Sequence, residues 1–296
     1  MTRGIESAAL VALLRGGCRP WQVYADLVEE AGSALAVLER EDGEHGQQSL
    51  FDEPRRDREL RLQAAADQIS SWQRAGMRLI TVLDPDYPEN LRAVHDRPPL
   101  IFVAGRLEPD DARSIAVVGT RSASPRGTLA ASAVAGHLVH HDYTVVSGLA
   151  AGIDTAAHTA ALARNGRTVA VIGTGLTRAY PPQNAALQRG IASQYAVISQ
   201  FWPDAPPSRR SFPMRNAVMS GLTLATVVIE ASDTSGSRLQ ARLALAHGRP
   251  VFLLESLLDQ HWARECAARP GTHVVGSPAE ITSIVERLTS SGALTA

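Results

Sequence analysis

The sequence predicts an α/β protein in which a doubly wound, mostly parallel sheet is joined to a small N-terminal helical domain. Two observations carry this prediction. From Ser114 onward, short apolar runs alternate with amphipathic segments, and the first two runs end in glycine and small hydroxyl residues before an Ala-rich segment begins. Alternating strands and helices require parallel strands joined by right-handed crossovers. Every strand-to-helix turn of such a sheet lies on the same edge, so residues far apart in sequence converge there.

The N-terminal third of the chain has a different pattern. Residues 1–75 are expected to form a helical domain, because apolar residues recur there at spacings of three and four. A polar segment over residues 39–59 interrupts this pattern and predicts a loop or a disordered stretch. Residues 76–113 are expected to form a transition segment with two extension strands, MRLITVLD and LIFVAGRL, around the turn-rich PDYPENL.

Residues 114–289 are expected to form the doubly wound domain, followed by a tail over residues 290–296. The apolar runs predict strands at 115–118, 144–147, 168–172, 196–199, 224–229, 250–254 and 273–275. The amphipathic segments predict helices at about 127–141, 154–165, 182–193, 215–222, 236–247, 257–268 and 278–288.

Length and composition favour a globular protein without membrane association. The chain has 296 residues, of which 45% are hydrophobic, so it can bury a full core. No window approaches the roughly 20 apolar residues of a membrane span, and the apolar stretch near the N-terminus contains Glu6 and no convincing cleavage site. We therefore expect a cytoplasmic location. Cys18 and Cys266 suggest neither a disulfide framework nor a metal site.

The basic residues are distributed unevenly, and all 29 of them are arginine. The absence of lysine excludes a Walker-type phosphate lysine, a Schiff base and a lysine general base, but arginine provides the forked donor that binds phosphate bidentately. The segment from Ala112 to Ser256 contains 13 arginines and 6 acidic residues, whereas the rest of the chain contains 16 and 24. An anionic ligand or partner is therefore expected at the middle of the chain.

The first strand-to-helix turn, residues 119–127, combines glycines, hydroxyl residues and two arginines beside a helix N-terminus. This chemistry fits phosphate. The turn is not a dinucleotide fingerprint, because G-x-G-x-x-G is missing. Ser124 as N-cap and Pro125 at the first helical position would explain part of the same turn without a ligand.

The second turn, residues 147–154, is followed by His158. Asp154 and His158 are four residues apart and share a helix face, a spacing compatible with acid–base or metal chemistry. No third and fourth metal ligands accompany them in the sequence, and Asp154 is well placed as a helix cap. We expect hydrogen bonding of the turn, and no catalytic residue, metal or cofactor.

Two later turns favour a polyanionic ligand. The connection over residues 201–216 mixes arginines with Phe201, Trp202 and Phe212, and single-stranded nucleic-acid grooves use cations for phosphates and rings for bases. The alternative is that these rings only attach the loop to the core. The turn over residues 230–238 places hydroxyls and an arginine at a helix start, where they could bind phosphate or serve as caps.

Five blocks, GTRSASPRG, SGLAAGIDTAAH, TVAVIGTGLTRAYPPQN, FPMRN and VVIEASDTSGS, resemble in order and spacing the DNA-processing DprA/Smf family. The resemblance extends over about residues 78–252. It implies a Rossmann-like domain that binds and protects single-stranded DNA, forms a homodimer and delivers the strand to the RecA recombinase during natural transformation. Members often carry an N-terminal helical, SAM-like domain, which residues 1–75 resemble.

The resemblance implies that Arg121, the 147–154 turn, Arg215, Asn216 and residues 235–237 line a DNA pocket. Ala217 stands where the family usually has a second arginine, which predicts weaker or less salt-dependent binding, and no C-terminal winged-helix domain is expected. Together with the turns above, the candidate DNA- or phosphate-binding residues are Gly119, Arg121, Ser122, Arg126, Ser147, Gly148, Gly152, Asp154, His158, Arg209, Arg210, Phe212, Arg215, Asn216, Ser235, Gly236, Ser237 and Arg238.

The first hypothesis is therefore a non-enzymatic, dimeric single-stranded DNA-binding protein. The alternative is a nucleotide-binding sensor or a phosphoribohydrolase-like enzyme that uses the same cleft. The Pro-Gly-Gly-x-Gly-Thr turn with a following glutamate that such hydrolases would show is absent, and Glu230 at a strand end is the one carboxylate placed to attack a glycosidic bond. A third possibility is that the N-terminal helices recruit a protein partner.

Overall fold

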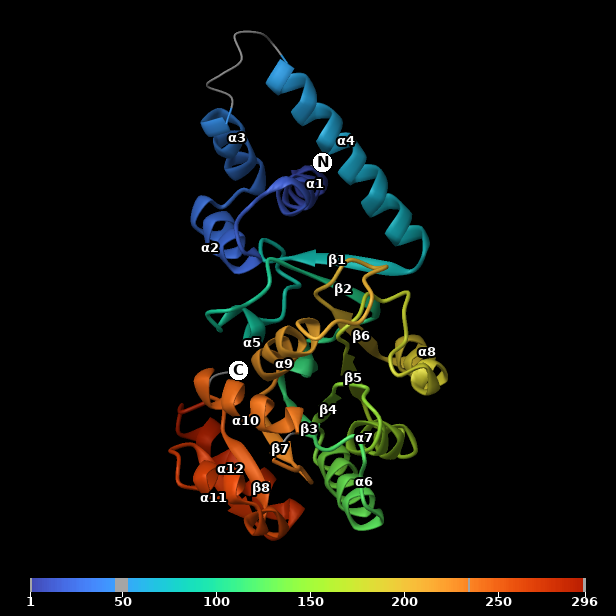
Figure 1. Cartoon of the computed structure of the whole chain (residues 1–296), viewed down its shortest axis with the longest axis vertical. Helices are drawn as coiled ribbons and strands as arrows, with labels where there is room; N and C mark the ends of the chain where they lie inside the picture. The colour runs from blue at the N-terminus through green and yellow to red at the C-terminus, as the bar shows by residue number, and fades with distance from the viewer. Residues whose placement is uncertain (1, 46–52, 234, 295–296) are drawn as a thin grey trace. The chain divides into compact units, whose positions relative to one another are not determined.

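The computed structural model describes residues 2–45, 53–233 and 235–294 (Figure 1). The chain divides into two compact units. Unit 1 comprises residues 1–87 and 96–102, and unit 2 comprises residues 88–95 and 103–296. The segment expected as a transition is thus shared between the two units, because the chain passes from one to the other more than once.

Unit 1 is built mainly from helices around a small apolar core that includes Leu10 and Tyr24, both fully buried. The charge inside the apolar stretch of the first helix has a structural explanation. The Glu6 carboxylate accepts the backbone N–H of Ala34 at 2.6 Å and of Leu35 at 3.2 Å, where negative charge stabilises the N-terminus of a helix. The elements are α1 (Thr2–Gly16), α2 (Trp21–Ala31), α3 (Ala34–His45), α4 (Glu53–Arg74), β1 (Met77–Thr81) and the start of β2 (Leu100–Gly105).

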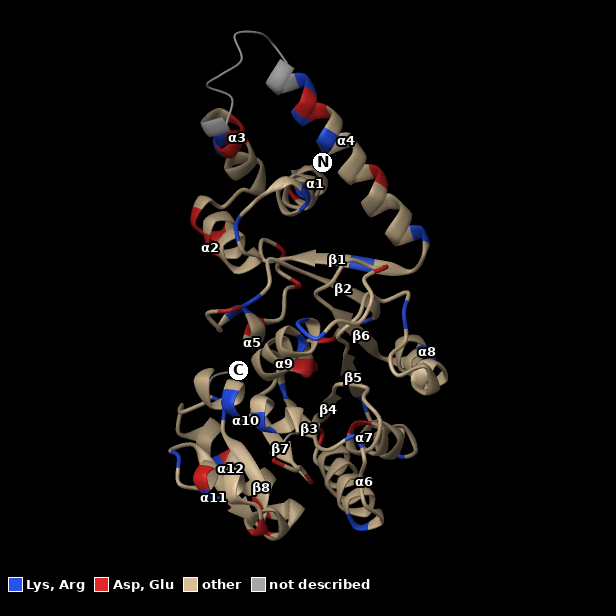
Figure 2. Ribbon diagram, in the orientation of Figure 1, with Lys and Arg blue, Asp and Glu red and all other residues tan. Residues whose placement is uncertain are grey.

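The loop predicted over residues 39–59 is largely wrong. Helices α3 and α4 run into this segment from both sides, and residues 46–52 lie outside the described residues. The high density of charge suggested a loop, but Glu and Arg are good helix formers and here they pair across the two helices. Arg61 Nη2 lies 2.5 Å from Asp42 Oδ1, and Figure 2 shows both signs of charge along α4.

The sheet of unit 2 confirms the predicted doubly wound, parallel architecture. Its strands follow the order β6-β5-β4-β3-β7-β8-β9, and each neighbouring pair is parallel. The order reverses at β3, where Ile115 is in register with Val145 of β4 on one side and Ala225 of β7 on the other. The strands are β3 (Ser114–Val118), β4 (Thr144–Ser147), β5 (Thr168–Val171), β6 (Ala196–Ser199), β7 (Ala225–Val228), β8 (Val251–Leu254) and β9 (Thr272–Val275).

The helices of unit 2 cover both faces of this sheet. Ile115 and Val145 belong to one buried cluster with Leu138 of α6, Ala157 of α7 and Val285 of α12. Helices α9 and α10 contact each other, and right-handed crossovers place the connections after the reversal on the opposite face (Figure 1). The helices are α5 (Glu89–Arg92), α6 (Pro125–His140), α7 (Ile153–Leu162), α8 (Ala185–Gln194), α9 (Ser211–Leu222), α10 (Gly236–Ala246), α11 (His261–Ala267) and α12 (Pro278–Ser290), with 3₁₀ turns at Pro109–Ala112, Pro182–Asn184 and Glu255–Asp259.

Helix α9 begins four residues earlier than the sequence pattern predicts. It starts at Ser211, although Pro213 lies in its first turn. The first four N–H groups of a helix have no partner within it, so the missing donor of proline is tolerated there. Ser208 and Ser211 close the start of the helix, because each accepts the backbone N–H of the other, at 3.0 and 3.1 Å. The earlier start places Arg215 inside the helix and not at its first position.

No helix among the described residues is both long and apolar enough to span a bilayer.

Candidate nucleic-acid interface

A cavity of about 420 Å³ lies at the carboxyl edge of the sheet of unit 2, where β3 and β7 are neighbours. This is the point at which the strand order reverses, and open α/β sheets bind ligands in the crevice outside such a point. We call it the switch-point cavity. Its lining residues are Val118, Gly119, Thr120, Arg121, Ala150, Asp154, Phe212, Arg215, Asn216, Met219, Ser232, Ser235, Gly236, Ser237 and Gln240.

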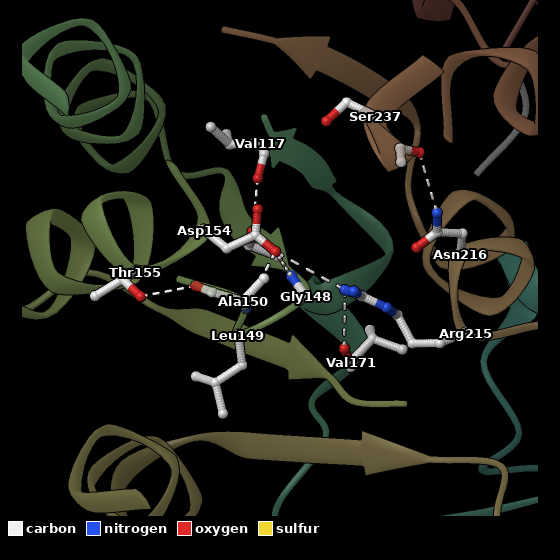
Figure 3. Close-up of polar contacts among 12 residues, drawn as sticks. Val117, Gly148, Leu149, Ala150, Asp154, Thr155, Val171, Arg215, Asn216 and Ser237 are labelled. Atoms are coloured by element: carbon white, nitrogen blue, oxygen red, sulfur yellow. Dashed lines mark hydrogen bonds and ion pairs between the residues drawn. The ribbon is translucent and has the colours of Figure 1, made fainter. Parts of the chain in front are cut away.

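Arg215 forms the floor of the cavity, and only 6% of its surface is exposed. Its Nη1 donates to the carbonyl of Val171 at 3.4 Å and lies 3.9 Å from Asp154 Oδ2 (Figure 3). Nε is buried and has no hydrogen-bond partner among the described residues. Burial lowers the pKa of Arg215, the carboxylate of Asp154 opposes that shift, and the nearby charge of Arg121 adds to it. A buried arginine with an unused donor is suited to an anion.

Asp154 organises the second turn and holds the counter-charge of Arg215. Its Oδ2 accepts the backbone N–H of Gly148 at 3.1 Å and of Ala150 at 3.3 Å (Figure 3). The residue lies in the first turn of α7, whose N-cap is Gly152, so it bonds the turn without being the cap. Burial raises the pKa of Asp154, and Arg215 opposes the rise. The carboxylate therefore acts on the shape and electrostatics of the turn.

The first and second turns are locked together through backbone. Ile153 donates its N–H to the carbonyl of Thr120 at 3.2 Å. Gly152 has φ of 78°, and a β-carbon on it would lie 2.4 Å from that same carbonyl oxygen. Only glycine fits at this position, because it tolerates the left-handed conformation and the close approach of two chain segments. The two turns thus present a preformed wall to the cavity.

An aromatic and cationic rim lies above Arg215. The guanidinium of Arg121 lies over the ring of Phe212, 5.0 Å from its centroid, and the ring of Tyr180 packs against Phe212 with centroids 5.5 Å apart. Arg121 is exposed, and 40% of Tyr180 is exposed. Tyr180 is absent from the sequence-based candidates. Both aromatic residues can be read from the sequence, but the contact between two rings 32 positions apart depends on the tertiary fold.

The fifth turn supplies hydroxyl and amide groups to the opposite wall. Ser235 is the N-cap of α10, and its Oγ accepts the N–H of Ser237 at 3.3 Å and lies 3.0 Å from Ser237 Oγ. Asn216 Nδ2 donates to the carbonyl of Gly236 at 3.5 Å, which links α9 to this turn (Figure 3). The wall therefore combines a helix N-terminus with small polar side chains, a combination that favours anions.

Two candidates, one in the second turn and one in the helix after it, are buried and do not line the switch-point cavity. Ser147 is fully buried, and its Oγ donates to the carbonyl of Val117 at 2.6 Å. His158 is also fully buried, with Nδ1 2.7 Å from Thr168 Oγ1, and burial lowers its pKa to about 3. Both point into the protein because a strand end and a helix face each alternate between the core and the surface.

The remaining candidates lie around the cavity and not in its lining. Gly148 packs against Arg215 and Gly152 against the first turn. Ser122 is exposed, with its N–H bonded to Thr120, and Arg209 and Arg210 are exposed just before α9. Arg126 lines a neighbouring cavity of about 410 Å³, and Arg238 lines a third one of about 270 Å³. The lining candidates are Gly119, Arg121, Asp154, Phe212, Arg215, Asn216, Ser235, Gly236 and Ser237.

Glu230, the carboxylate that the hydrolase alternative requires, forms hydrogen bonds within the protein. Its Oε2 accepts both the backbone N–H and the hydroxyl of Ser124, each at 3.0 Å. Ser124 in turn caps α6 by accepting the N–H of Gly127 at 2.9 Å. Glu230 thus supports a helix start beside the neighbouring cavity, and it does not line the switch-point cavity.

Residues 78–290 match the protein family described as DNA recombination-mediator protein A. DNA processing protein DprA of Streptococcus pneumoniae is 41% identical over 180 residues, which are 60% of this chain and 64% of that protein. Protein Smf of Synechocystis is 37% identical over 202 residues, which are 67% of this chain and 51% of that protein. The chain spans between about half and two thirds of the length of these relatives.

Solved structures show the same fold. The X-ray structure of DprA from Streptococcus pneumoniae has a TM-score of 0.72 and 29% sequence identity, and the match covers 94% of this chain and 97% of that one. DprA from Helicobacter pylori, whose structure describes a single-stranded DNA binding mode, has a TM-score of 0.62 and 23% identity over 73% of this chain and 96% of that one.

Proposed function

We propose, since the chain belongs to the DNA recombination-mediator protein A family, that unit 2 binds single-stranded DNA at the switch-point cavity. The family and the doubly wound fold expected from the sequence blocks are confirmed. One arrangement carries the proposal: Arg215 at the floor of the cavity, with Arg121 stacked on Phe212 at its rim. It offers a buried cation, an exposed cation and an aromatic face within one concave site.

Electrostatics favours a phosphate backbone as the ligand. Arg121 and Arg215 contribute two positive charges to the lining, and Asp154 contributes one negative charge. The N-terminus of α10, capped by Ser235, adds its partial positive charge to the same wall. A phosphate near Arg215 could satisfy the guanidinium Nε that has no hydrogen-bond partner among the described residues, and this removes the cost of an unsatisfied buried donor.

The rim favours a single strand over a duplex. Phe212 is partly exposed, and Tyr180 lies against it. Aromatic faces bind bases that are unstacked and turned outward, which a single strand provides without breaking base pairs. Arg121 both neutralises phosphate and presents a planar group for stacking, so this one residue couples the two modes of recognition.

The wider biological role extends this proposal. The protein acts by binding and not by catalysis, protects the strand it holds, and does so as a homodimer in the cytoplasm. Handover of the strand to a RecA-type recombinase follows as the last step. Light scattering on the purified protein tests the dimer, and co-sedimentation of recombinase with protein-bound DNA tests the handover.

The direct test is fluorescence anisotropy with a labelled oligo-dT and a duplex of equal length at low salt. We expect the wild type to bind the single strand more tightly than the duplex, and Arg121→Glu to abolish binding. Arg164→Glu is the matched control, because Arg164 is exposed at the end of α7, on the opposite edge of the sheet from the turns. Absence of oligo-dT binding by the wild type, or equal losses in both variants, would refute the proposal.

A further inference from the structure

A second arginine site lies next to the switch-point cavity. Between α10 and α11 there is a cavity of about 270 Å³ into which three arginines converge. We call Arg238, Arg242 and Arg269 the arginine cluster. Ser235 lines both this cavity and the switch-point cavity, so the two adjoin at the start of α10. The remaining lining residues are Asp233, Leu239, Trp262, Glu265 and Cys266.

The arginine cluster is not neutralised within the protein. Asp233 and Glu265 line the same cavity, but no carboxylate among the described residues forms an ion pair with any of the three guanidinium groups. Arg238 bonds the backbone carbonyl of Asp233 and leaves that carboxylate unused. In unit 1, by contrast, arginines such as Arg97 contact carboxylates directly.

The arginine cluster places three exposed positive charges around one cavity. Arg238 and Arg242 are one helical turn apart on α10, and like charges at this spacing destabilise a helix slightly. Arg269, which follows α11, brings a third positive charge to the same hollow. Figure 2 shows basic residues on α10. An anion that bridges these guanidinium groups removes the repulsion, so the arrangement is suited to a phosphate chain.

One member of the cluster, Arg238, is attached to the turn before α10, because it donates to the carbonyl of Asp233. The guanidinium of Arg238 lies over the ring of Trp262, 5.8 Å from its centroid. Only 4% of the surface of Trp262 is exposed, and its Nε1 donates to the carbonyl of Ala231 at 3.4 Å. Because Trp262 is buried, it supports the arginine and offers no face for a base. The arginine cluster is therefore suited to backbone phosphate and offers no aromatic face for a base.

We propose that a strand bound at the switch-point cavity continues past Ser235 and places its next phosphates on the arginine cluster. This inference rests on the proposed function and adds a second, sequence-independent segment to the binding track. It assigns Arg242 and Arg269, which the turn motifs do not include, to DNA binding. It also explains why Arg238, which follows the fifth turn, points away from the first cavity.

The test is a length series of oligo-dT from about 4 to about 16 nucleotides, the range that single-stranded sites occupy. We expect Arg242→Glu/Arg269→Glu to lower the affinity for the longest oligonucleotides at least tenfold and to leave the shortest ones unchanged. Arg164→Glu/Arg287→Glu, which makes the same charge change at exposed sites outside both cavities, should bind every length like the wild type. The slope of log affinity against log salt should fall by about 0.7 per lost phosphate contact.

Cys266 provides a second readout that does not depend on affinity. In a Cys18→Ser background its thiol is the only one in the chain. Long oligonucleotides should slow its reaction with a thiol reagent, and short ones should not. The extension is wrong if short oligonucleotides bind the wild type, the double variant binds long oligonucleotides as tightly as the wild type does, and long oligonucleotides do not slow the reaction of Cys266. If no oligonucleotide binds the wild type, the proposed function itself has failed.

Discussion

Gly148 and Arg215 occupy adjoining space that leaves no room for a β-carbon. A β-carbon built on Gly148 would lie 1.1 Å from Arg215 Nη1 and 2.2 Å from Cζ. The guanidinium is held there by the carbonyl of Val171 and the carboxylate of Asp154, so it cannot move without losing both contacts. Glycine at the end of β4 is therefore what allows a buried cation to reach the floor of the switch-point cavity.

Gly148→Ala is expected to displace the guanidinium and weaken DNA binding. Loss of a hydrogen bond to a charged group corresponds to about 1.5–3 kcal/mol, or about 10- to 150-fold in affinity. Anisotropy with oligo-dT measures the change. Gly190→Ala is the matched control, because a β-carbon there meets nothing within 4 Å and Gly190 lies within α8. Unchanged binding by Gly148→Ala would show that Arg215 does not contact the strand.

Asp154→Asn is expected to destabilise unit 2 because it leaves the charge of Arg215 uncompensated. Breaking a buried pair by removing one partner costs about 3–5 kcal/mol, whereas removing both charges costs much less. The double variant Asp154→Asn/Arg215→Gln should therefore recover most of the free energy of unfolding, measured in urea. A single variant as stable as the wild type would mean that the two groups do not interact appreciably.

The salt dependence of affinity should distinguish residues that contact phosphates from residues that contact bases. Arg121→Gln removes one cation, so the slope of log affinity against log salt should fall in magnitude by about 0.7. Phe212→Leu keeps the charge and removes a stacking face, so affinity should fall by about 1–3 kcal/mol with no change in slope. Both slopes come from the same anisotropy titrations. An altered slope in Phe212→Leu would mean that the ring only positions Arg121.

Stability should fall with acidification because of His158. Its Nδ1 donates to Thr168 Oγ1, which itself donates to the carbonyl of Val145, and its buried Nε2 has no acceptor among the described residues. The folded pKa is about 3, below the ordinary 6.5, so the unfolded chain binds an extra proton between these values. The free energy of unfolding should drop by about 1.4 kcal/mol per pH unit in this range.

His158→Gln isolates this contribution from the other histidines. Burial also lowers the pKa values of His137 and His273. Their contribution to the pH dependence of stability is the same in the wild type and in the His158→Gln variant. The difference in slope between the wild type and the variant, from urea titrations at pH 6.5 down to pH 4, therefore reports on His158. Parallel pH dependences would show that the imidazole is not protected from protons in the folded state.

Local patterns in the sequence were sufficient for the elements and for the edge at which the site lies. The apolar runs predict all the strands from β3 to β9, and those from β3 to β7 are continuous apolar segments because they are buried on both faces. The cap at Ser124 and the proline after it predict the start of α6. The turns between strands and helices of a parallel sheet share one edge, so the sequence predicts that Arg121, Arg215 and Ser235 lie near one another.

The tertiary structure alone decided which of these turns meet and which side chains line the cavity. The reversal of strand order at β3 brings the first and fifth turns together, and strand order is set by long-range packing that local periodicity does not encode. The packing of neighbouring elements buries His158 completely, and the fold places Tyr180 against Phe212. Arg238 lines the cavity beside α11 and not the switch-point cavity, because its guanidinium lies over the ring of Trp262, 24 positions later in the chain.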